Sequence, residues 1–578
     1  MVGLKAPPYE TYMKIKSQLN QIITKALEDA NIEAKDIVIS DATKPEFGDY
    51  QFNGAMKLAK VLRKNPRAIA TDIIQHIDTT GMIARVEVAG AGFINIWLDN
   101  NWLSTQATTI LDDNRVGVGY VQTPQRVVVD YSGPNMAKQM HVGHLRSSII
   151  GDTLATLLEF LGDEVIRQNH IGDWGTQFGM LIAYLEEQGA DANQNLKDLE
   201  QFYKDAKVRF DQSEEFANKA REYVVKIQSG DKHCLGLWKK FIDKSLGHCE
   251  EVYAKLGVNL TRNDVRAESF YNSELPNIIQ ILKDKNISTN SNGAECVFVD
   301  GEDKPPVIIQ KGDGGFLYAT TDLSALKFRA TELKADRICY VVDARQGQHF
   351  KQVFAISKQA GMVGESISLE HIAFGTMMDK SGRPFKTRDG GTVKLIDLLD
   401  EAVVRAKETI KKRNEYNEEE LNRVATAIGI GAVKYADLSI SRESNYLFSW
   451  DKMLSFDGNT ALYMQYAYAR IQSIFRKHNA EINGKIIISD ELEHRLSLMI
   501  LKFEDTLTKA SIDATPHTIT SYLYDLVTLF MKFYEQNPIL KDGVEEEVKM
   551  SRLQLSQLTA NVIKKGLDIL GIEVVDRI

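Results

Sequence analysis

Two histidines around a glycine, His141, Gly143 and His144, stand where a strand is expected to give way to a helix. Three consecutive valines within residues 126–130 predict a buried strand, and the Ser-Gly-Pro-Asn sequence at 132–135 ends it. Leucines and isoleucines at three- and four-residue spacing then predict a helix that begins near Gly143. A helix N-terminus attracts anions, imidazoles can donate to phosphate oxygens, and a glycine lets a nucleotide approach the backbone. The stretch therefore predicts a nucleoside triphosphate site, although two surface histidines at a helix start would give the same short pattern.

A second candidate pair, Tyr318 and Asp322, lies four residues apart at the expected start of another helix, so both side chains can face the same side. A carboxylate can hold the planar fork of a guanidinium with two hydrogen bonds, and a neighbouring tyrosine can stack on it. The pair therefore suits arginine and rejects lysine. A helix cap and a core aromatic residue would leave the same pattern.

The elements around these residues alternate between strand and helix. A second strand is predicted over 165–169, and a turn punctuated by Gly172 and Gly175 leads into a helix that runs to about Glu187. This order is typical of a doubly wound parallel sheet, which binds ligands at the carboxyl ends of its strands. The fold class is therefore α/β.

An insertion is expected between the two halves of this sheet, over about 190–312. Residues 190–265 are charged and helical in pattern, and 286–301 and 306–311 are predicted to form strands. A further strand of the main sheet is expected over 337–343.

The two ends of the chain have different patterns. Residues 1–120 predict an α+β module, with a helix marked by apolar residues between Ile15 and Leu27 and a hairpin formed by 85–88 and 93–98. Beyond Thr392 the pattern is almost wholly helical, beginning with 393–413 and 417–436.

Composition is that of a globular protein. The chain has 578 residues, which suggests three or four domains, with 43% hydrophobic and 26% charged residues. The first residues lack the apolar core of a signal peptide and no stretch approaches eighteen apolar residues, so no membrane partner and a cytoplasmic location are expected. The net charge of −9 does not exclude RNA, which needs only a local basic face. No structural metal is predicted, since no metal-binding spacing relates the four cysteines, Cys234, Cys249, Cys296 and Cys339.

The segment PNMAKQMHVGH, residues 134–144, resembles the signature region of class I aminoacyl-tRNA synthetases in the form that arginyl-tRNA synthetases use. The resemblance extends to PEFGDYQFN at 45–53, AGFINI at 91–96, HIGDWGTQFG at 170–179 and GNTALYMQYAYARIQSI at 458–474. It implies a Rossmann-type parallel-sheet catalytic domain with an insertion, an N-terminal α+β add-on domain and a C-terminal all-α anticodon-binding domain of the DALR type. The expected divisions are 1–120, 121–400, a helical linker at 401–455, and 456–578.

The resemblance also implies an activity and partners. The family activates L-arginine with ATP, which brings Mg²⁺ as part of the substrate, and transfers the arginyl group from arginyl-adenylate to the 3′ end of tRNA(Arg). A monomer is expected.

Site residues are carried over from the family only where this sequence matches its motifs. Those implied to act in catalysis are His141, His144, Lys138, Lys386 and Arg388. Those implied to border ATP are Gly143, His144, Gly172, Gly175, Gly347, His349 and Met378. Those implied to hold arginine are Asn135, Tyr318, Asp322, Gln346 and Glu268. Those implied to contact tRNA are Phe93, Asn95, Tyr463 and Tyr466.

The sequence departs from the family pattern in the second signature loop, 374–391, where Pro384 occupies the position of the first lysine. Lys386 and Arg388 can supply part of the missing charge. Arginyl enzymes that lack that lysine have one upstream of the first signature histidine, and Lys138 matches it here. Gly90 is a second departure, at a position where some relatives have a polar residue that contacts a base.

Other readings remain open at this point. A synthetase of the cysteinyl type would need a zinc site that binds a thiol, and a small adenylyltransferase would lack both terminal domains. A synthetase-derived RNA-binding regulator without catalysis should have lost signature residues, and only Pro384 favours that reading.

Overall fold

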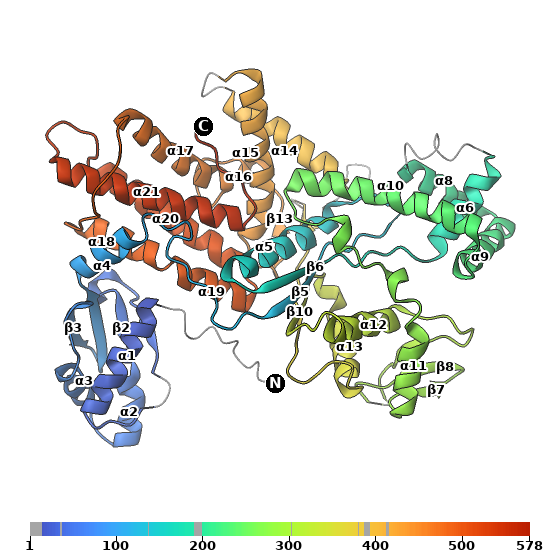
Figure 1. Cartoon of the computed structure of the whole chain (residues 1–578), viewed down its shortest axis with the longest axis horizontal. Coiled ribbons are helices and arrows are strands. Elements are labelled where there is room, and N and C mark those ends of the chain that lie inside the picture. The colour runs from blue at the N-terminus through green and yellow to red at the C-terminus, as the bar shows by residue number, and fades with distance from the viewer. Residues whose placement is uncertain are drawn as a thin grey trace.

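A four-stranded parallel sheet lies at the centre of the chain (Figure 1). Its order is β11-β10-β5-β6, formed by Ser368–His371, Arg337–Tyr340, Arg126–Asp130 and Glu164–Gln168. Helix α5 (Leu145–Leu161) joins β5 to β6, and α13 (Gly347–Gln359) joins β10 to β11. The central neighbours β5 and β10 are about two hundred residues apart, so the winding direction reverses between them, which opens a crevice at their carboxyl ends. The predicted α/β fold class is confirmed.

The computed structural model describes residues 14–34, 37–136, 138–189, 199–301, 303–379, 381–385, 393–411 and 416–578. Lys386 and Arg388 lie outside the described residues.

The floor of the crevice is held by an ion pair with almost no contact with water. Arg329 Nη2 donates to Asp130 Oδ2 at 2.7 Å and Arg329 Nε donates to Gln168 Oε1 at 2.7 Å. Arg329 belongs to α12 (Tyr318–Thr331), which therefore sits directly against the ends of β5 and β6. The prediction of a helix carrying Tyr318 and Asp322 is confirmed.

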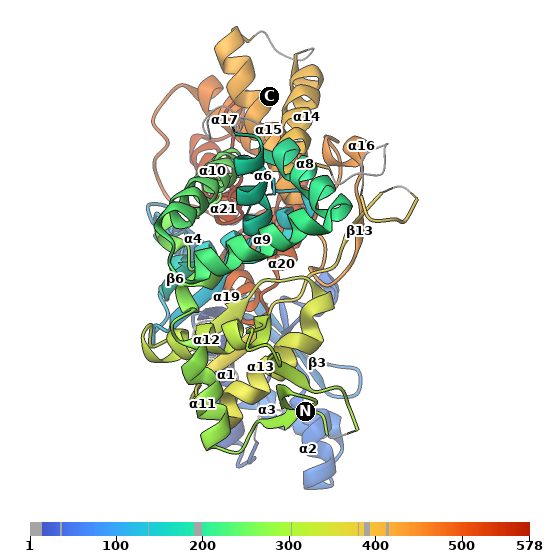
Figure 2. The ribbon, with the colours of Figure 1, turned by 90° about the vertical axis from the view of Figure 1, so that its right-hand side faces the viewer.

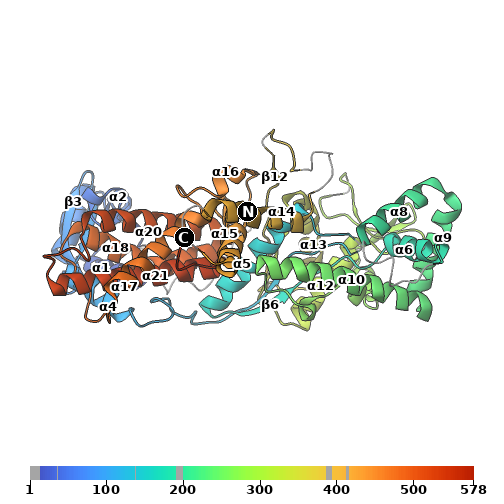
Figure 3. The same ribbon diagram turned by 90° about the horizontal axis from the view of Figure 1, so that it is seen from above.

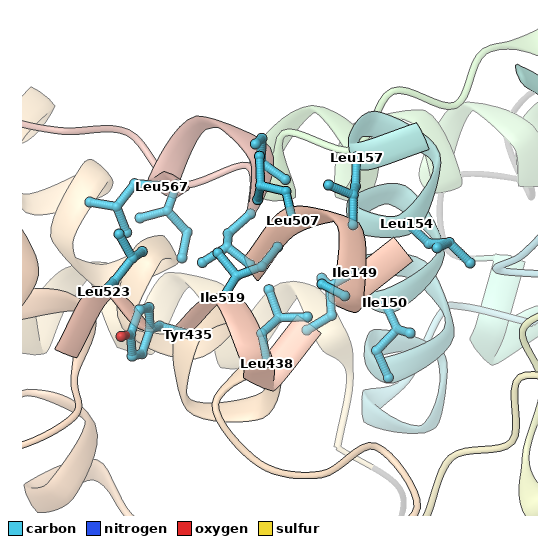
Figure 4. Packing of buried hydrophobic residues seen from close by; sticks show 14 of the residues in the cluster. Ile149, Ile150, Leu154, Leu157, Tyr435, Leu438, Leu507, Ile519, Leu523 and Leu567 are labelled. Atoms are coloured by element: carbon cyan, nitrogen blue, oxygen red, sulfur yellow. The ribbon is translucent and has the colours of Figure 1, made fainter. Parts of the chain in front are cut away.

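Helix α5 is buried on nearly every side, which explains its high content of leucine and isoleucine. Ile149 and Leu157 face leucines and isoleucines of the C-terminal helices, whereas Leu154 points from the opposite side of α5 (Figure 4). A Cβ added to Gly151 would lie 2.2 Å from Tyr131 Cβ, so the helix also packs closely on the end of β5. The start of α5 is thereby placed by both the sheet and the helical domain.

The N-terminal module has an antiparallel sheet in the order β1-β2-β4-β3, formed by Ile39–Asp41, Tyr50–Phe52, Phe93–Leu98 and Ile83–Ala89. Its helices are α1 (Lys14–Asp29), α2 (Gly54–Leu62), α3 (Pro66–Gln75) and α4 (Asn100–Thr109). The predicted hairpin is confirmed. Pro66 begins helix α3, which the sequence did not predict. The Asn65 side chain caps this helix by accepting from Arg67 N–H at 2.8 Å.

The insertion has two parts that lie on opposite sides of the sheet in the views of Figure 1 and Figure 2. The helical part follows α6 (Thr176–Glu187) and comprises α8 (Leu199–Gln212), α9 (Glu214–Gln228) and α10 (Lys232–Leu256). The second part comprises α11 (Leu275–Asp284) and an antiparallel sheet of β7 (Thr289–Ser291), β8 (Ala294–Val297) and β9 (Val307–Gln310). The helices predicted within 190–265 and the strands predicted within 286–301 and 306–311 are confirmed in the part of the chain that the structure describes.

The C-terminal part is helical and begins with α14 (Leu395–Ile410) and α15 (Glu418–Leu438). The short strands β12 (Met377–Met378) and β13 (Tyr446–Leu447) pair in parallel, followed by α16 (Trp450–Met453). The remaining helices are α17 (Ala461–His478), α18 (Glu491–Leu501), α19 (Phe503–Asp513), α20 (Pro516–Gln536) and α21 (Glu546–Ile569). These helices and the N-terminal module form one end of the molecule, and α8 to α10 form the other (Figure 3). Within the described ranges, no helix combines the length and the apolar character needed to cross a bilayer.

Candidate active site

The two signature histidines lie in contact at the start of α5, with ring centres 4.1 Å apart. Gly143 N–H donates to His141 Nδ1 at 3.0 Å, and His141 N–H donates to His144 Nδ1 at 3.1 Å. Because each Nδ1 accepts a hydrogen bond, the proton of each neutral ring is on Nε2. Both imidazoles can therefore present an Nε2–H donor to an anion.

Their surroundings keep the rings neutral. Burial, with the neighbouring His141, lowers the pKa of His144 to about 3. Burial and the charge of Lys138 lower the pKa of His141 below its usual value. Lys138 is exposed, and its Nζ lies 5.3 Å from the ring centre of Tyr203 on α8. The loop thus combines two neutral donors with one cation.

The glycines of the site are required for different reasons. A Cβ on Gly143 would lie 2.7 Å from His141 Cε1, and one on Gly172 would lie 2.4 Å from Asn135 Oδ1. Gly175 has φ +123°, a conformation that side chains disfavour. A Cβ on Gly347 would meet only the His371 ring at an ordinary 3.7 Å, so internal packing does not require that glycine.

Carboxylates gather where β6 ends and α12 begins. Asp322 Oδ2 accepts from His349 Nε2 at 2.6 Å, and buried Asp173 accepts from Ser269 N–H at 2.9 Å. Burial and the negative charges of Asp173 and Asp322 raise the pKa of Glu268 to about 7. Such a site is short of positive charge, and a cationic ligand would satisfy it.

Tyr318 lies beside this cluster and is 72% exposed. Burial of its hydroxyl and the charge of Glu268 raise its pKa. The open ring and the carboxylates around it match the predicted guanidinium pocket in composition.

The histidine loop and the carboxylate cluster are joined by backbone pairing. Met136 N–H donates to Gly172 O at 2.9 Å, and Gly172 N–H donates to Pro134 O at 3.2 Å. The exposed Asn135 stands between these two bonds, and Asp173 follows Gly172. The structure therefore brings together the residues predicted for the triphosphate and those predicted for arginine.

Comparison with known proteins agrees with this geometry. Family models match at residues 14–98 (arginyl tRNA synthetase N terminal domain), 106–450 (tRNA synthetases class I (R), catalytic domain) and 464–578 (DALR anticodon binding domain). The chain is 52% identical over 573 residues to arginine–tRNA ligase of Chromobacterium violaceum, covering 98% of this chain and 100% of that one. It is 51% identical over 577 residues to arginine–tRNA ligase of Alteromonas mediterranea, with the same coverage.

The chain belongs to the arginyl-tRNA synthetase family.

Solved structures of arginyl-tRNA synthetases share the fold. The enzyme from Plasmodium falciparum superimposes with a TM-score of 0.83 at 30% identity, covering 98% of this chain and 99% of that one. The enzyme from Thermus thermophilus gives 0.83 at 24% identity, covering 98% and 100%. The chain is thus an arginine-specific aminoacyl-tRNA ligase, which activates arginine with ATP and charges tRNA.

The second signature loop of this synthetase begins at β12. Pro384 forms an isolated antiparallel bridge with Met378, and Phe385 N–H donates to Met377 O at 3.1 Å. The Phe385 ring packs 4.7 Å from the ring of Phe448. Pro384 therefore supports the base of the loop, and this enzyme has no cation at that position.

The residues predicted to contact tRNA lie in different surroundings. Phe93 is half-buried at the start of β4, whereas Asn95 is 2% exposed and its Oδ1 accepts from Gln51 Nε2 at 2.7 Å. The Asn95 side chain is therefore not available to a tRNA base, because its amide is hydrogen-bonded within the sheet. On α17, Tyr466 is partly exposed and its hydroxyl accepts from Arg470 at 3.0 Å, and Tyr463 lies 6.1 Å from Tyr524.

Sequence reasoning missed the part that Asp173 plays. It stands directly after a glycine beyond the end of β6, which is the position that binds ligands in a parallel sheet. This position was the signal by which Asp173 could have been identified from the sequence. In the part of the chain that the structure describes, no three or more His, Cys, Asp or Glu side chains are arranged so that they could hold a metal ion.

Proposed function

We propose that arginine is activated in the crevice beyond the carboxyl ends of β5 and β10, with the ATP phosphates at His141 and His144 and the guanidinium at Asp322 and Glu268. The observation that carries this proposal is the pairing of the histidine loop with the loop that bears Asp173. That pairing sets the two half-sites next to each other. A carboxylate oxygen of bound arginine can then reach the α-phosphorus of ATP.

In the first step this carboxylate oxygen attacks the α-phosphorus in line, the bond to the bridging oxygen breaks, and pyrophosphate leaves with the Mg²⁺ that entered with ATP. The Nε2–H groups of His141 and His144 stabilise the charge that grows on the phosphate oxygens, without a covalent enzyme intermediate. In the second step a 2′ or 3′ hydroxyl of the terminal adenosine of tRNA attacks the carbonyl carbon of arginyl-adenylate, and AMP leaves.

Specificity for arginine comes from the carboxylate cluster. Asp322 and Glu268 accept from the guanidinium and Tyr318 stacks on it, while Asn135 and Gln346, both exposed, hold the ammonium and carboxylate end. Lysine offers a single point charge and cannot satisfy two carboxylates with a planar fork. The pocket therefore selects by shape as well as by charge.

The ATP side of the crevice is bordered by the remaining predicted residues, Gly143, Gly172, Gly175, Gly347, His349 and Met378. Lys138 supplies the charge that Pro384 cannot, and Lys386 and Arg388 add to it from the second signature loop. His349 connects the two sides, since its Nε2 is bonded to Asp322.

The proposed division into domains assigns tRNA contacts to both ends of the chain. The outer corner of tRNA(Arg) meets the N-terminal domain, 1–120, where the half-buried ring of Phe93 is placed to stack on an unpaired base. The anticodon meets the helical domain, 456–578, through Tyr463 and Tyr466. The enzyme acts as a monomer in the cytoplasm.

The test is arginine-dependent exchange of labelled pyrophosphate into ATP, measured with and without tRNA. The wild-type enzyme is expected to be active, and His144→Ala is expected to lose at least about a hundredfold, the scale of one oxyanion-type donor. A thermal melt of the variant serves as the folding control. Exchange at the wild-type rate in a folded His144→Ala variant would reject the role of the histidine loop.

A further inference from the structure

Arg146 lies in the first turn of α5, two residues after His144, yet its partners come from the helical part of the chain. Its side chain is 2% exposed, and that of Asp437 on α15 is 0% exposed. Arg146 Nε donates to Asp437 Oδ1 at 3.1 Å, and Nη1 donates to Ser444 O at 2.9 Å. The guanidinium carbon also lies 5.3 Å from the ring centre of Tyr446. One buried side chain thus joins the start of α5 to α15 and to residues 442–448.

Residues 442–448, which we call the clasp segment, form the support of β12. Within this segment, β13 pairs in parallel with β12, and Phe448 N–H donates to Met378 O at 2.9 Å. A Cβ added to Gly375 would lie 2.7 Å from backbone atoms of Ser444. Gly375, two residues before β12, is therefore packed directly against the clasp segment.

The clasp segment also contacts the residues that follow β11 and α19. Arg442 Nη1 donates to Ala373 O at 2.7 Å, and Arg442 Nε donates to Ala514 O at 3.0 Å. The segment is therefore bonded to the strand end before β12 and to the end of α19. Through Ser444, Arg146 is therefore bonded to a segment that is itself bonded to the residues after β11 and after α19.

Packing alone does not explain why an ion pair is buried at this position. Among the atoms that the structure describes, Arg146 Nη2 has no hydrogen-bond partner, and Asp437 Oδ2 lies 3.1 Å from Arg146 Nε, which already donates to Oδ1. Buried ion pairs are often no more stabilising than apolar side chains of the same volume, and one that is incompletely satisfied gains still less. The benefit of this pair is therefore expected in geometry, since a guanidinium fixes distance and direction at several atoms at once.

We propose that Arg146 is a positioning residue for arginine activation, which holds the start of α5, with His144, at a fixed place relative to β12. The inference rests on the proposed role of the histidine loop. It adds that the spacing between the histidine loop and β12 is held by one buried side chain together with Asp437 and Ser444.

Two variants of the full-length enzyme test this inference. Arg146→Lys keeps the charge beside Asp437 and loses the fork that reaches Ser444. The double variant Arg146→Met, Asp437→Leu replaces the pair with apolar side chains, a change that buried pairs often tolerate. Arg337→Lys is the matched control, because Arg337 is likewise a buried arginine that pairs with a carboxylate, Glu370 at 2.7 Å, and donates to a backbone oxygen, Ser511 O at 3.3 Å.

Both test variants are expected to fold, with thermal midpoints close to that of the wild type. In the exchange assay with tRNA present, kcat is expected to fall at least about tenfold while KM for ATP changes less than about threefold, because alignment in the transition state is lost and ground-state contacts remain. Arg337→Lys is expected to keep the wild-type kcat even where its melting temperature falls.

A wild-type kcat in the folded double variant would make the pair purely structural and overturn the inference. If the double variant does not fold, a wild-type kcat in Arg146→Lys overturns it, and unfolding of both variants overturns it as well. His144→Ala, assayed in parallel, separates the two hypotheses. A wild-type rate there contradicts the proposed function, whereas loss there with full activity in folded Arg146 variants contradicts only the positioning role.

Discussion

Replacement of Asp322 by asparagine isolates the carboxylate on which the choice of arginine depends. Asp322 lies one turn into α12, is 15% exposed on its side chain, and accepts from His349 Nε2 at 2.6 Å. Asparagine has the same shape and can still accept from His349, so the local packing is expected to survive. The charge that faces the guanidinium is lost.

The magnitude follows from the contact that is removed. A hydrogen bond to a charged partner contributes about 1.5–3 kcal/mol, which corresponds to about a 10- to 150-fold increase in KM for arginine. The KM for ATP is expected to change less than about twofold, since uniform binding of ATP does not involve this carboxylate. A second effect accompanies the first. The charge of Asp322 helps to raise the pKa of Glu268. In the variant that pKa falls below about 7, and the pH dependence of arginine binding moves to lower pH.

The assay is steady-state exchange at several arginine concentrations between pH 6 and pH 8. Glu274→Gln is the matched control, because Glu274 is a surface carboxylate just before α11 that bonds to Lys327 of α12, the helix that carries Asp322, at 2.7 Å. It is expected to leave the KM for arginine unchanged. If Asp322→Asn keeps both the wild-type KM for arginine and the wild-type pH profile, the guanidinium does not bind at this carboxylate and the reasoning is refuted.

Three further predictions test the site and its support. The pKa of Glu268 is about 7, above its unfolded value, so the group is neutral below that pH. The KM for arginine should therefore fall about tenfold from pH 6 to pH 8. Glu268→Gln should flatten this pH profile, and a flat wild-type profile would contradict the assignment. Gly143→Ala puts a Cβ 2.7 Å from His141 Cε1, so the displaced ring should cost about a hundredfold in exchange at an unchanged melting temperature, and an unaltered rate would argue against the geometry. Arg329→Met leaves a buried carboxylate unpaired and should cost about 3–5 kcal/mol in urea unfolding. Arg345→Met, at an exposed ion pair, should cost less than about 1 kcal/mol, and equal losses would refute the burial argument.

Local patterns predicted the elements well. The valines of β5, the helical spacing in α5 and the glycines of the hairpin between β3 and β4 each act over a few residues, and each prediction is confirmed. The same holds for Tyr318 and Asp322, whose spacing alone placed them on one helix turn. Pro66 shows the limit of such patterns, because proline usually interrupts a helix and here begins one.

Contacts between distant segments could not be predicted in this way. Nothing in the sequence near Asp173 states that Glu268 and Asp322 lie close enough to raise a pKa, and nothing near Asn95 states that Gln51 occupies its amide. These outcomes depend on the order of strands and on how the insertion returns to the sheet.

The sequence by itself determined which chemical groups this synthetase has and the local elements that carry them, because residue types and short periodicities act within one helix turn or one strand. Only the tertiary structure decided that the histidines are neutral donors, that three carboxylates lie close enough for their charges to raise a pKa, and that Arg146 bonds to residues almost three hundred positions away. The reason is physical. Burial, mutual charge and packing of side chains arise between segments that the folded chain brings together, and no local pattern encodes those distances.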